Sequence, residues 1–201
     1  MKNIIITVLA AALIISLCQC KGIEMSKDRN SYRFNPMPLD DDWSKWLVGE
    51  WEGSGGSDTG SGKSVTSVEL VLNGQFRIHK EEAVITEITL EQRQYLKKNM
   101  HATDEEIDRF KSLPFKDWEI YTIEQGTGDV VGYLFDSLRC IAKGRGKREG
   151  NKEIVEWEWA TGHKSTRITE RVSDDKVAIV QRTLMPDGSV MEEKSEMARR
   201  R

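Results

Sequence analysis

The chain has 201 residues, of which 38% are hydrophobic and 31% charged, with a formal net charge of −3. This length accommodates one domain with a sizeable core, or at most two small domains. The slight acidic excess argues against nucleic-acid binding, which usually requires a basic surface. The 6 tryptophans cluster in strand-like segments and predict a core or a pocket rich in large rings.

The N-terminus predicts an export signal that precedes the fold. Lys2 supplies a positive charge, and the apolar segment Ile4–Leu17 that follows is too short to span a bilayer comfortably. The segment ends in Cys18-Gln19-Cys20, which resembles the bacterial lipobox, whose cysteine is lipidated. Cys20 is the preferred lipidation site because Leu17 lies three residues before it, and Cys18 is the second choice. An ordinary secretory signal that happens to end in cysteines is the alternative.

We therefore predict a signal peptide over residues 1–19, a lipid-anchored flexible tether over residues 20–42 and one folded domain over residues 43–201. The acidic run Asp40–Asp42 is interpreted as a solvated entrance or as the cap of a short turn at Trp43–Trp46. The predicted location is the bacterial cell envelope, with an acyl chain such as palmitate in the membrane, on the periplasmic side or at the outer membrane. Cys140 then has no partner for a disulfide within the domain and is interpreted as a small buried residue, with a reactive thiol as the alternative.

The first half of the predicted domain has a strand pattern with tight turns. Trp46–Gly53 is the first strand signal, Gly53–Ser64 is interpreted as a flexible loop, and Asn73-Gly74 predicts a two-residue hairpin turn. A strand is expected over Phe76–Ile88. The side chains predicted to point inward from it are Phe76, Ile78, Val84, Thr86 and Ile88.

A helical insert over residues 89–114 interrupts the strands. Thr89 with Gln92, and Thr103 with Glu106, have the spacing of N-terminal capping boxes for two short helices. Pro114 ends the second helix. We interpret the pair as a lid or plug on the domain, with a partner-binding hairpin as the alternative.

After the insert, turns recur at regular spacing. The expected strands are Trp118–Glu124, Val130–Ser137, Leu138–Gly146, Glu153–Thr161, Ser165–Val172, Val177–Leu184 and Val190–Arg199. About ten strands in total predict an all-β fold with a meandering antiparallel sheet. Closure into a barrel is favoured because it removes exposed sheet edges.

The sequence contains no catalytic or metal-binding motif that we recognise, and no cofactor is predicted. His79, His101 and His163 lie far apart and lack zinc-ligand spacing. An apolar pocket with a few polar groups is expected inside the barrel. Its predicted lining residues are Trp118, Tyr133, Trp157, Trp159 and Gln181. The alternative is that a helix and large rings fill the barrel.

Gly49-x-Trp51 on the first strand, a meander of about ten strands and an arginine at the end of the last strand together resemble the calycin superfamily, which includes the lipocalins. The resemblance implies that Trp51 closes one end of the barrel, with Gly49 beside it. It also implies that an arginine of the final strand packs over this tryptophan. Arg199 is the first candidate and Arg200 the second. An arginine over an indole face gains from cation–π attraction.

More narrowly, Trp46–Gly53, Gly132–Ser137 and Pro186-Asp187-Gly188 resemble motifs of an uncharacterised bacterial family of lipocalin-like domains. The related nitrobindin-like barrels bind haem through a histidine near the chain end. The last histidine here is His163, so haem binding is not expected.

These features predict an exported lipoprotein that binds a small apolar or amphipathic ligand in a β-barrel. The alternative is a non-enzymatic envelope interaction module that uses the helical insert as its contact surface, and an enzyme ranks third. The expected partners are the small lipophilic ligand and the membrane, and nucleic acid is not among them. The sequence predicts no particular oligomeric state.

Overall fold

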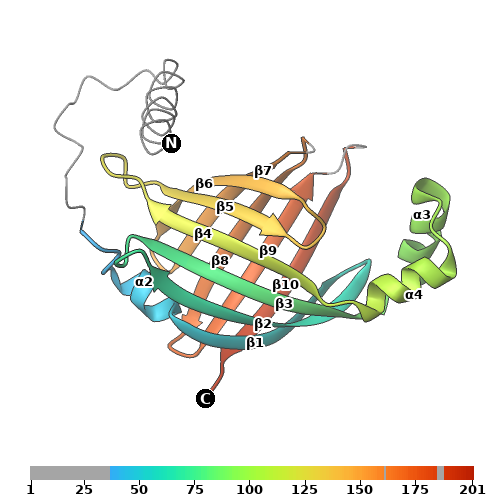
Figure 1. Cartoon of the computed structure of the whole chain (residues 1–201), viewed down its shortest axis with the longest axis horizontal. Coiled ribbons are helices and arrows are strands. Elements are labelled where there is room, and N and C mark those ends of the chain that lie inside the picture. The colour runs from blue at the N-terminus through green and yellow to red at the C-terminus, as the bar shows by residue number, and fades with distance from the viewer. Residues whose placement is uncertain (1–36, 161, 185–187) are drawn as a thin grey trace, which may run out of the picture. The chain divides into compact units, whose positions relative to one another are not determined.

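The computed structural model describes residues 37–160, 162–184 and 188–201. The predicted signal peptide, Cys18, Cys20 and most of the tether lie outside these ranges, as does part of the predicted turn at Pro186-Asp187-Gly188. In the described part, ten strands pair antiparallel in chain order and β10 pairs back to β1, which closes a barrel (Figure 1). The predicted all-β barrel of about ten strands with a two-helix insert is confirmed. No helix in these ranges is long and apolar enough to cross a membrane.

The elements follow one another with short connections apart from the insert. The helices are α2 (Asp42–Leu47), α3 (Leu90–Met100) and α4 (Asp104–Ser112). The strands are β1 (Gly49–Ser57), β2 (Gly60–Val71), β3 (Phe76–Ile88), β4 (Phe115–Ile123), β5 (Val130–Asp136), β6 (Ile141–Glu149), β7 (Lys152–Trp159), β8 (Lys164–Ser173), β9 (Lys176–Leu184) and β10 (Val190–Arg199).

The first strand begins later than predicted, because Trp46 and Leu47 belong to the short helix α2. Asp41 caps this helix by accepting a 2.7 Å hydrogen bond from the backbone N–H of Ser44, as expected for the acidic run. The helix packs its indoles against the barrel: the ring centroids of Trp46 and Trp51 lie 5.4 Å apart.

The prediction of a flexible loop over Gly53–Ser64 is wrong, because this segment forms the hairpin of β1 and β2. The glycines of this hairpin allow the backbone of β10 to approach β1 closely. A Cβ atom on Gly53 would lie 2.1 Å from the carbonyl oxygen of Glu196, and one on Gly55 would lie 2.6 Å from that of Lys194. The predicted turn at Asn73-Gly74 is confirmed in position, with φ of 59° and 77° at these two residues. The prediction of a two-residue turn is wrong, because Val71 pairs with Phe76 and the connection has four residues.

The predicted bounds of β3 are confirmed. Its predicted inward face is wrong over most of the strand, although Ile88, beyond a register shift at Ser61 and Gly62, does line the pocket. Arg77 is only 1% exposed, whereas Val84 is 42% exposed. Alternation shows that a strand has two faces and does not show which face is buried. Here the face with Arg77, His79 and Glu81 turns inward, where Arg77 forms a buried ion pair with Glu153.

The two helices of the insert begin as predicted. Thr89 accepts a hydrogen bond from the N–H of Gln92, and Thr103 forms a complete capping box with Glu106. Arg93 of α3 donates to Asp104 of α4, which joins the two helices. They lie at one end of the barrel, and α2 lies at the other end (Figure 1).

Two apolar clusters fill parts of the interior. The first lies at the α2 end and contains Trp43, Trp46, Leu47, Trp51, Val68, Val177 and Met197. The second lies against β4–β7 and contains Tyr121, Val130, Leu134, Ala142, Val155 and Trp157. Charged side chains occupy interior positions beside these clusters.

Candidate ligand pocket

Trp51 and Arg199 meet at the α2 end of the barrel. The indole of Trp51 is 1% exposed and donates a 2.8 Å hydrogen bond to the carbonyl oxygen of Leu47. The guanidinium carbon of Arg199 lies 4.3 Å from the indole centroid. The same guanidinium donates from Nη1 to the carbonyl oxygen of Val48 over 2.7 Å and from Nη2 to that of Trp46. These contacts join the last strand to the end of α2 and close the barrel.

Gly49 allows this closure. Its φ is 134°, which L-residues rarely adopt, and a Cβ atom at this position would lie 2.7 Å from Nη1 of Arg199. Arg200, the second candidate for the stacking position, lies at the surface instead, with its Nη1 3.6 Å from a carboxylate oxygen of Glu50.

A chain of ion pairs, buried at its inner end, connects α2 to the barrel interior. Arg77 donates a 2.5 Å hydrogen bond to Glu153, and Arg148 donates to the other oxygen of Glu153 over 2.9 Å. Arg148 also donates to Asp41 and Ser44 of the α2 cap over 2.5 and 3.1 Å. Because Arg77 is nearly inaccessible, it depends on Glu153 for compensation of its charge.

A second polar group of side chains surrounds Glu119. This buried carboxylate accepts a 2.6 Å hydrogen bond from the hydroxyl of Tyr121 and a second hydrogen bond from Arg167. Arg167 also donates from Nε to the amide oxygen of Gln181 over 2.9 Å. Its guanidinium carbon lies 5.8 Å from the ring centroid of Trp157. Arg167 is therefore held on three sides by groups of the barrel itself.

Two further interior carboxyls, those of Asp117 and Glu81, have no ion-pair partner in the described part of the chain, and neither has the exposed carboxyl of Glu193 on β10. Burial, with the negative charges of Glu119 and Glu81, raises the pKa of Asp117 to about 8. Burial also raises the pKa of Glu81 and that of Glu193, while Arg167 opposes both shifts. The interior therefore holds more acidic groups than its buried arginines neutralise.

His79 lies among these groups and is neutral. Burial, together with the charges of Arg77 and Arg167, lowers the pKa of His79 well below its usual value. Its Nδ1 is 3.8 Å from a carboxylate oxygen of Glu119, and its Nε2 is buried without a hydrogen-bond partner.

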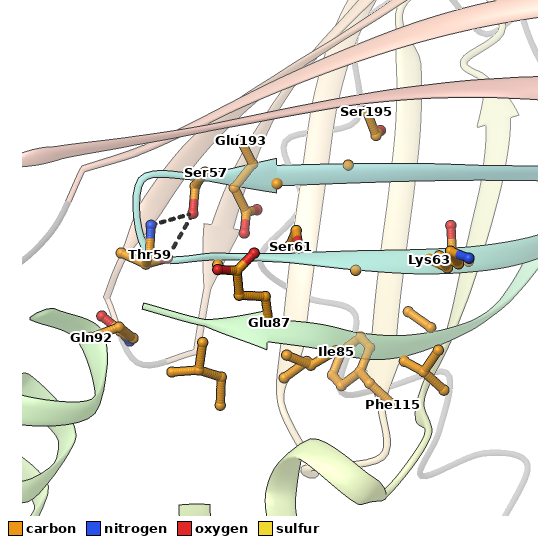
Figure 2. Close-up of a pocket in the computed structure, with 18 of the residues that line it drawn as sticks. Ser57, Thr59, Ser61, Lys63, Ile85, Glu87, Gln92, Phe115, Glu193 and Ser195 are labelled. Atoms are coloured by element: carbon orange, nitrogen blue, oxygen red, sulfur yellow. Dashed lines mark hydrogen bonds between the residues drawn. The ribbon is translucent and has the colours of Figure 1, made fainter. Parts of the chain in front are cut away.

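A pocket of about 820 Å³ lies at the end of the barrel covered by α3 and α4. Small residues of β1 and β2 form one side, and Figure 2 shows Ser57, Thr59 and Ser61 of this hairpin. Polar groups come from Glu81, Glu87, Arg167, Gln181 and Glu193. The apolar lining includes Ala83, Ile85, Ile88, Leu96, Ile107, Phe110, Phe115, Leu138, Ile179 and Met197. The insert thus contributes to the pocket lining from one end of the barrel.

Only some of the predicted pocket residues point inward. Trp118 is 55% exposed and Tyr133 is 44% exposed, so the prediction that they line the interior is wrong. They belong to the outer faces of β4 and β5, where Trp118 stacks with Lys80. Trp157 is 1% exposed and packs edge-on against Tyr121, while Trp159 lies beside it, partly buried. Among the five, Gln181 lines the pocket.

The charged residues of the interior are absent from the pocket that the sequence predicts. The inward strand faces that carry Arg77, Tyr121 and Gln181 also carry Glu81, Asp117, Glu119 and Arg167. The alternation of side chains between the two faces of a strand therefore does place these residues together. The opposite faces of β3 and β4 carry more apolar side chains, and the interior was expected there for that reason. The alternating pattern Asp117-x-Glu119-x-Tyr121 was the feature of the sequence that could have indicated a charged inward face on this strand.

The described residues contain no group of three His, Cys, Asp or Glu side chains arranged to hold a metal ion. Cys140 lies between β5 and β6 and is half-buried, so its interpretation as a buried core residue is wrong. Burial and the neighbouring Asp136 raise the pKa of its thiol, which disfavours the reactive thiolate.

No family model matches the sequence, and no curated protein matches it. Solved structures with similar folds include the S-type phycobiliprotein lyase CPES from Guillardia theta, with a TM-score of 0.54 and 9% identity over 82% of this chain and 94% of that one. A de novo designed fluorescence-activating β-barrel overlaps with a TM-score of 0.38 and 12% identity over 80% of this chain and 99% of that one. At 9% identity, the likeness to the lyase shows a shared fold alone. The fold is a calycin-like barrel.

Proposed function

We propose that this protein binds a small amphipathic molecule in the pocket beneath α3 and α4. The observation that carries the proposal is the pocket itself, which holds about 820 Å³ between an inner barrel wall and a helical cover. Sites for small molecules commonly measure roughly 300–1,000 Å³ and combine an apolar lining with a few polar groups. This pocket has both features.

The two ends of the barrel differ in a way that favours this function. The α2 end is closed by Trp51 and Arg199, with indoles packed between them and the helix. At the other end, Ile107 of α4 is 2% exposed while Phe110 and Leu96 line the pocket. A ligand therefore enters at the α3–α4 end, and displacement of α4 widens the entrance.

Binding of a neutral fluorescent dye, Nile red, to the full chain tests the proposal. A Ser195→Trp variant places an indole in the pocket wall, opposite the space left by Gly55, and is expected to weaken dye binding at least tenfold. Glu196→Trp is the matched control, because Glu196 is exposed and lies on the outer face of β10. Equal dye binding by the wild type and both variants would place the dye outside the pocket and contradict the proposal.

We further propose that the chain is an exported bacterial lipoprotein of the lipocalin-like family that its motifs resemble. The support is the sequence around Leu17 and Cys20. Metabolic labelling with palmitate is expected in the wild type and absent from Cys20→Ser. Labelling that survives this change and disappears in Cys18→Ser would move the lipid to Cys18.

A further inference from the structure

We infer that the outer face of β4, β5 and β6 binds a second copy of this chain through a patch of aromatic and apolar side chains. This outer patch consists of Trp118, Ile120, Tyr133, Phe135 and Ile141. It lies on the outside of the barrel and shares no residue with the ligand pocket. The register of the strands, the exposure of these side chains and the charges around them support the contact.

The register of three neighbouring strands brings the side chains of the outer patch together (Figure 1). Trp118 of β4 pairs directly with Phe135 of β5, which pairs with Ile141 of β6. In the adjacent row, Ile120 pairs with Tyr133. Directly paired residues have their side chains on the same face of a sheet. The residues that alternate with them along the strands are buried inside the barrel, namely Glu119, Leu134 and Ala142.

The outer patch is large for an exposed apolar surface. Trp118 is 55% exposed, Ile141 is 48% exposed, and Tyr133 and Phe135 are each 44% exposed. With about 200 Å² for a whole aromatic side chain, the three rings alone expose roughly 300 Å². The largest apolar patch on a typical monomer measures roughly 300–600 Å² and often has a function. The outer patch therefore has the size of an interaction surface.

Charged residues of both signs border the outer patch. The Nζ atom of Lys80 lies 5.5 Å from the ring centroid of Trp118. Three lysines next to the patch each have a glutamate neighbour on the same outer face: Lys80 with Glu69, Lys116 with Glu82, and Lys143 with Glu158. A second copy presents the same border, so lysines of one copy meet glutamates of the other around a shared apolar centre.

A strongly anionic partner fits this border less well than a second copy does. An anionic membrane surface attracts cations that are free to bind it. Lys80 and Lys116 are instead paired with glutamates of the same face, and the chain as a whole carries a net charge of −3. The face is thus apolar at its centre and mixed in charge at its border, as a self-complementary two-fold contact requires.

The size of the face sets the expected strength of the dimer. With its charged border, the outer patch offers roughly 600 Å² on each copy, so a dimer buries roughly 1,200 Å² in total. Specific protein–protein interfaces usually bury about 1,200–2,000 Å². We therefore expect a weak dimer that forms reversibly as the concentration rises.

Sedimentation velocity of the full chain tests this contact, with Cys18→Ser and Cys20→Ser introduced so that no acyl chain is attached. Loading concentrations run from about 5 μM to about 500 μM, a range that covers weak protein–protein affinities. We expect the sedimentation coefficient to rise from the monomer value to the dimer value and not beyond it, because a two-fold contact closes on itself. A protein that stays monomeric throughout overturns the inference. Binding of such a monomer to phosphatidylglycerol vesicles would assign the face to a membrane instead.

Charge insertions in the same unlipidated chain then locate the contact. Phe135→Lys and Tyr133→Lys each place a charge inside the outer patch and are expected to weaken dimerisation at least tenfold. Val172→Lys is the matched control, because Val172 is 59% exposed on β8, outside the patch, and it should leave dimerisation unchanged. Dimerisation that persists in both patch variants would place the contact elsewhere and overturn the inference. The concentration series without a patch substitution remains decisive if a variant does not fold.

Discussion

Arg199 lies over the indole of Trp51, 4.3 Å from its centroid, and bonds to the backbone of Trp46 and Val48, where α2 passes into β1. The side chain of Arg199 thus connects the last strand, the first strand and α2. We expect Arg199→Ala to lower the free energy of unfolding by about 2–3 kcal/mol, through lost charged hydrogen bonds and cation–π attraction. Urea denaturation followed by tryptophan fluorescence measures this. Arg200→Ala removes a neighbouring surface charge and should cost under about 0.5 kcal/mol.

Trp51 is expected to matter for stability before it matters for a ligand. Trp51→Ala removes a buried indole that is 1% exposed and should lower the free energy of unfolding by about 3–5 kcal/mol. Dye affinity of the folded fraction should stay near that of the wild type, because Trp51 does not line the pocket. A loss of affinity without a loss of stability would contradict this assignment.

Gly49 and Arg199 should be energetically coupled. Gly49→Ala introduces a Cβ atom 2.7 Å from Nη1 of Arg199 and strains a φ of 134°. We expect a loss of at least about 1 kcal/mol, part of which is relieved when Arg199 is also alanine. A double-mutant cycle by urea denaturation should give a coupling energy of about 0.5 kcal/mol or more. Additive effects would show that the clash does not contribute and that the backbone strain alone is responsible.

The buried ion-pair chain predicts a large effect at Glu153. Glu153→Gln leaves the buried Arg77 without a counter-charge and weakens the hold on Arg148. The expected loss of unfolding free energy is about 3–5 kcal/mol. Glu156→Gln, on the exposed face of the same strand, is the control and should change stability by under about 0.5 kcal/mol. Partial recovery in Glu153→Gln combined with Arg77→Met would identify the uncompensated guanidinium as the cause.

Asp117 predicts that stability falls as pH rises through neutrality. Its pKa is about 8 in the folded protein and about 3.9 in an unfolded chain. Between these values the folded state holds a proton that the unfolded state has lost, so the free energy of unfolding decreases with increasing pH. The groups facing it are Glu81, Glu119, Asp136 and Arg167, of which only the arginine favours ionisation.

Urea denaturation at pH 5, 6.5 and 8 checks this dependence. The wild type should lose on the order of 2–4 kcal/mol between pH 5 and 8. Asp117→Asn cannot ionise and should show a smaller loss, with the two proteins differing most at pH 8. A parallel decline in both proteins would assign the dependence to Glu81 and Glu193, whose pKa values are raised in the same direction.

The sequence was sufficient for those parts of the fold that local chemistry determines. The bounds of Phe76–Ile88 and Val190–Arg199 agree with β3 and β10, and the capping patterns at Thr89 and Thr103 locate both helices of the insert. In each case a turn, a cap or an alternating pattern lies within a few residues of the boundary that it predicts.

Long-range pairing explains the errors. The segment Gly53–Ser64 has the local composition of a loop, but it forms strands because the backbones of β3 and β10 approach it closely. The inward face of β3 was wrong because Arg77 is compensated by Glu153, a residue 76 positions away in the sequence. Trp118 was placed inside for its size, although its strand buries Asp117 and Glu119 instead.

The position of α2 has a practical consequence. The chain enters the barrel beside this helix, where the backbone N–H of Leu39 bonds to the carbonyl oxygen of Gly74 over 2.7 Å, and the pocket opens at the other end beneath α4. A surface attached directly before Met37 therefore lies at the end of the barrel away from the pocket. Ligand exchange should accordingly run at the same rate on immobilised and free protein, whereas a bulky fusion inserted between α3 and α4 should slow it.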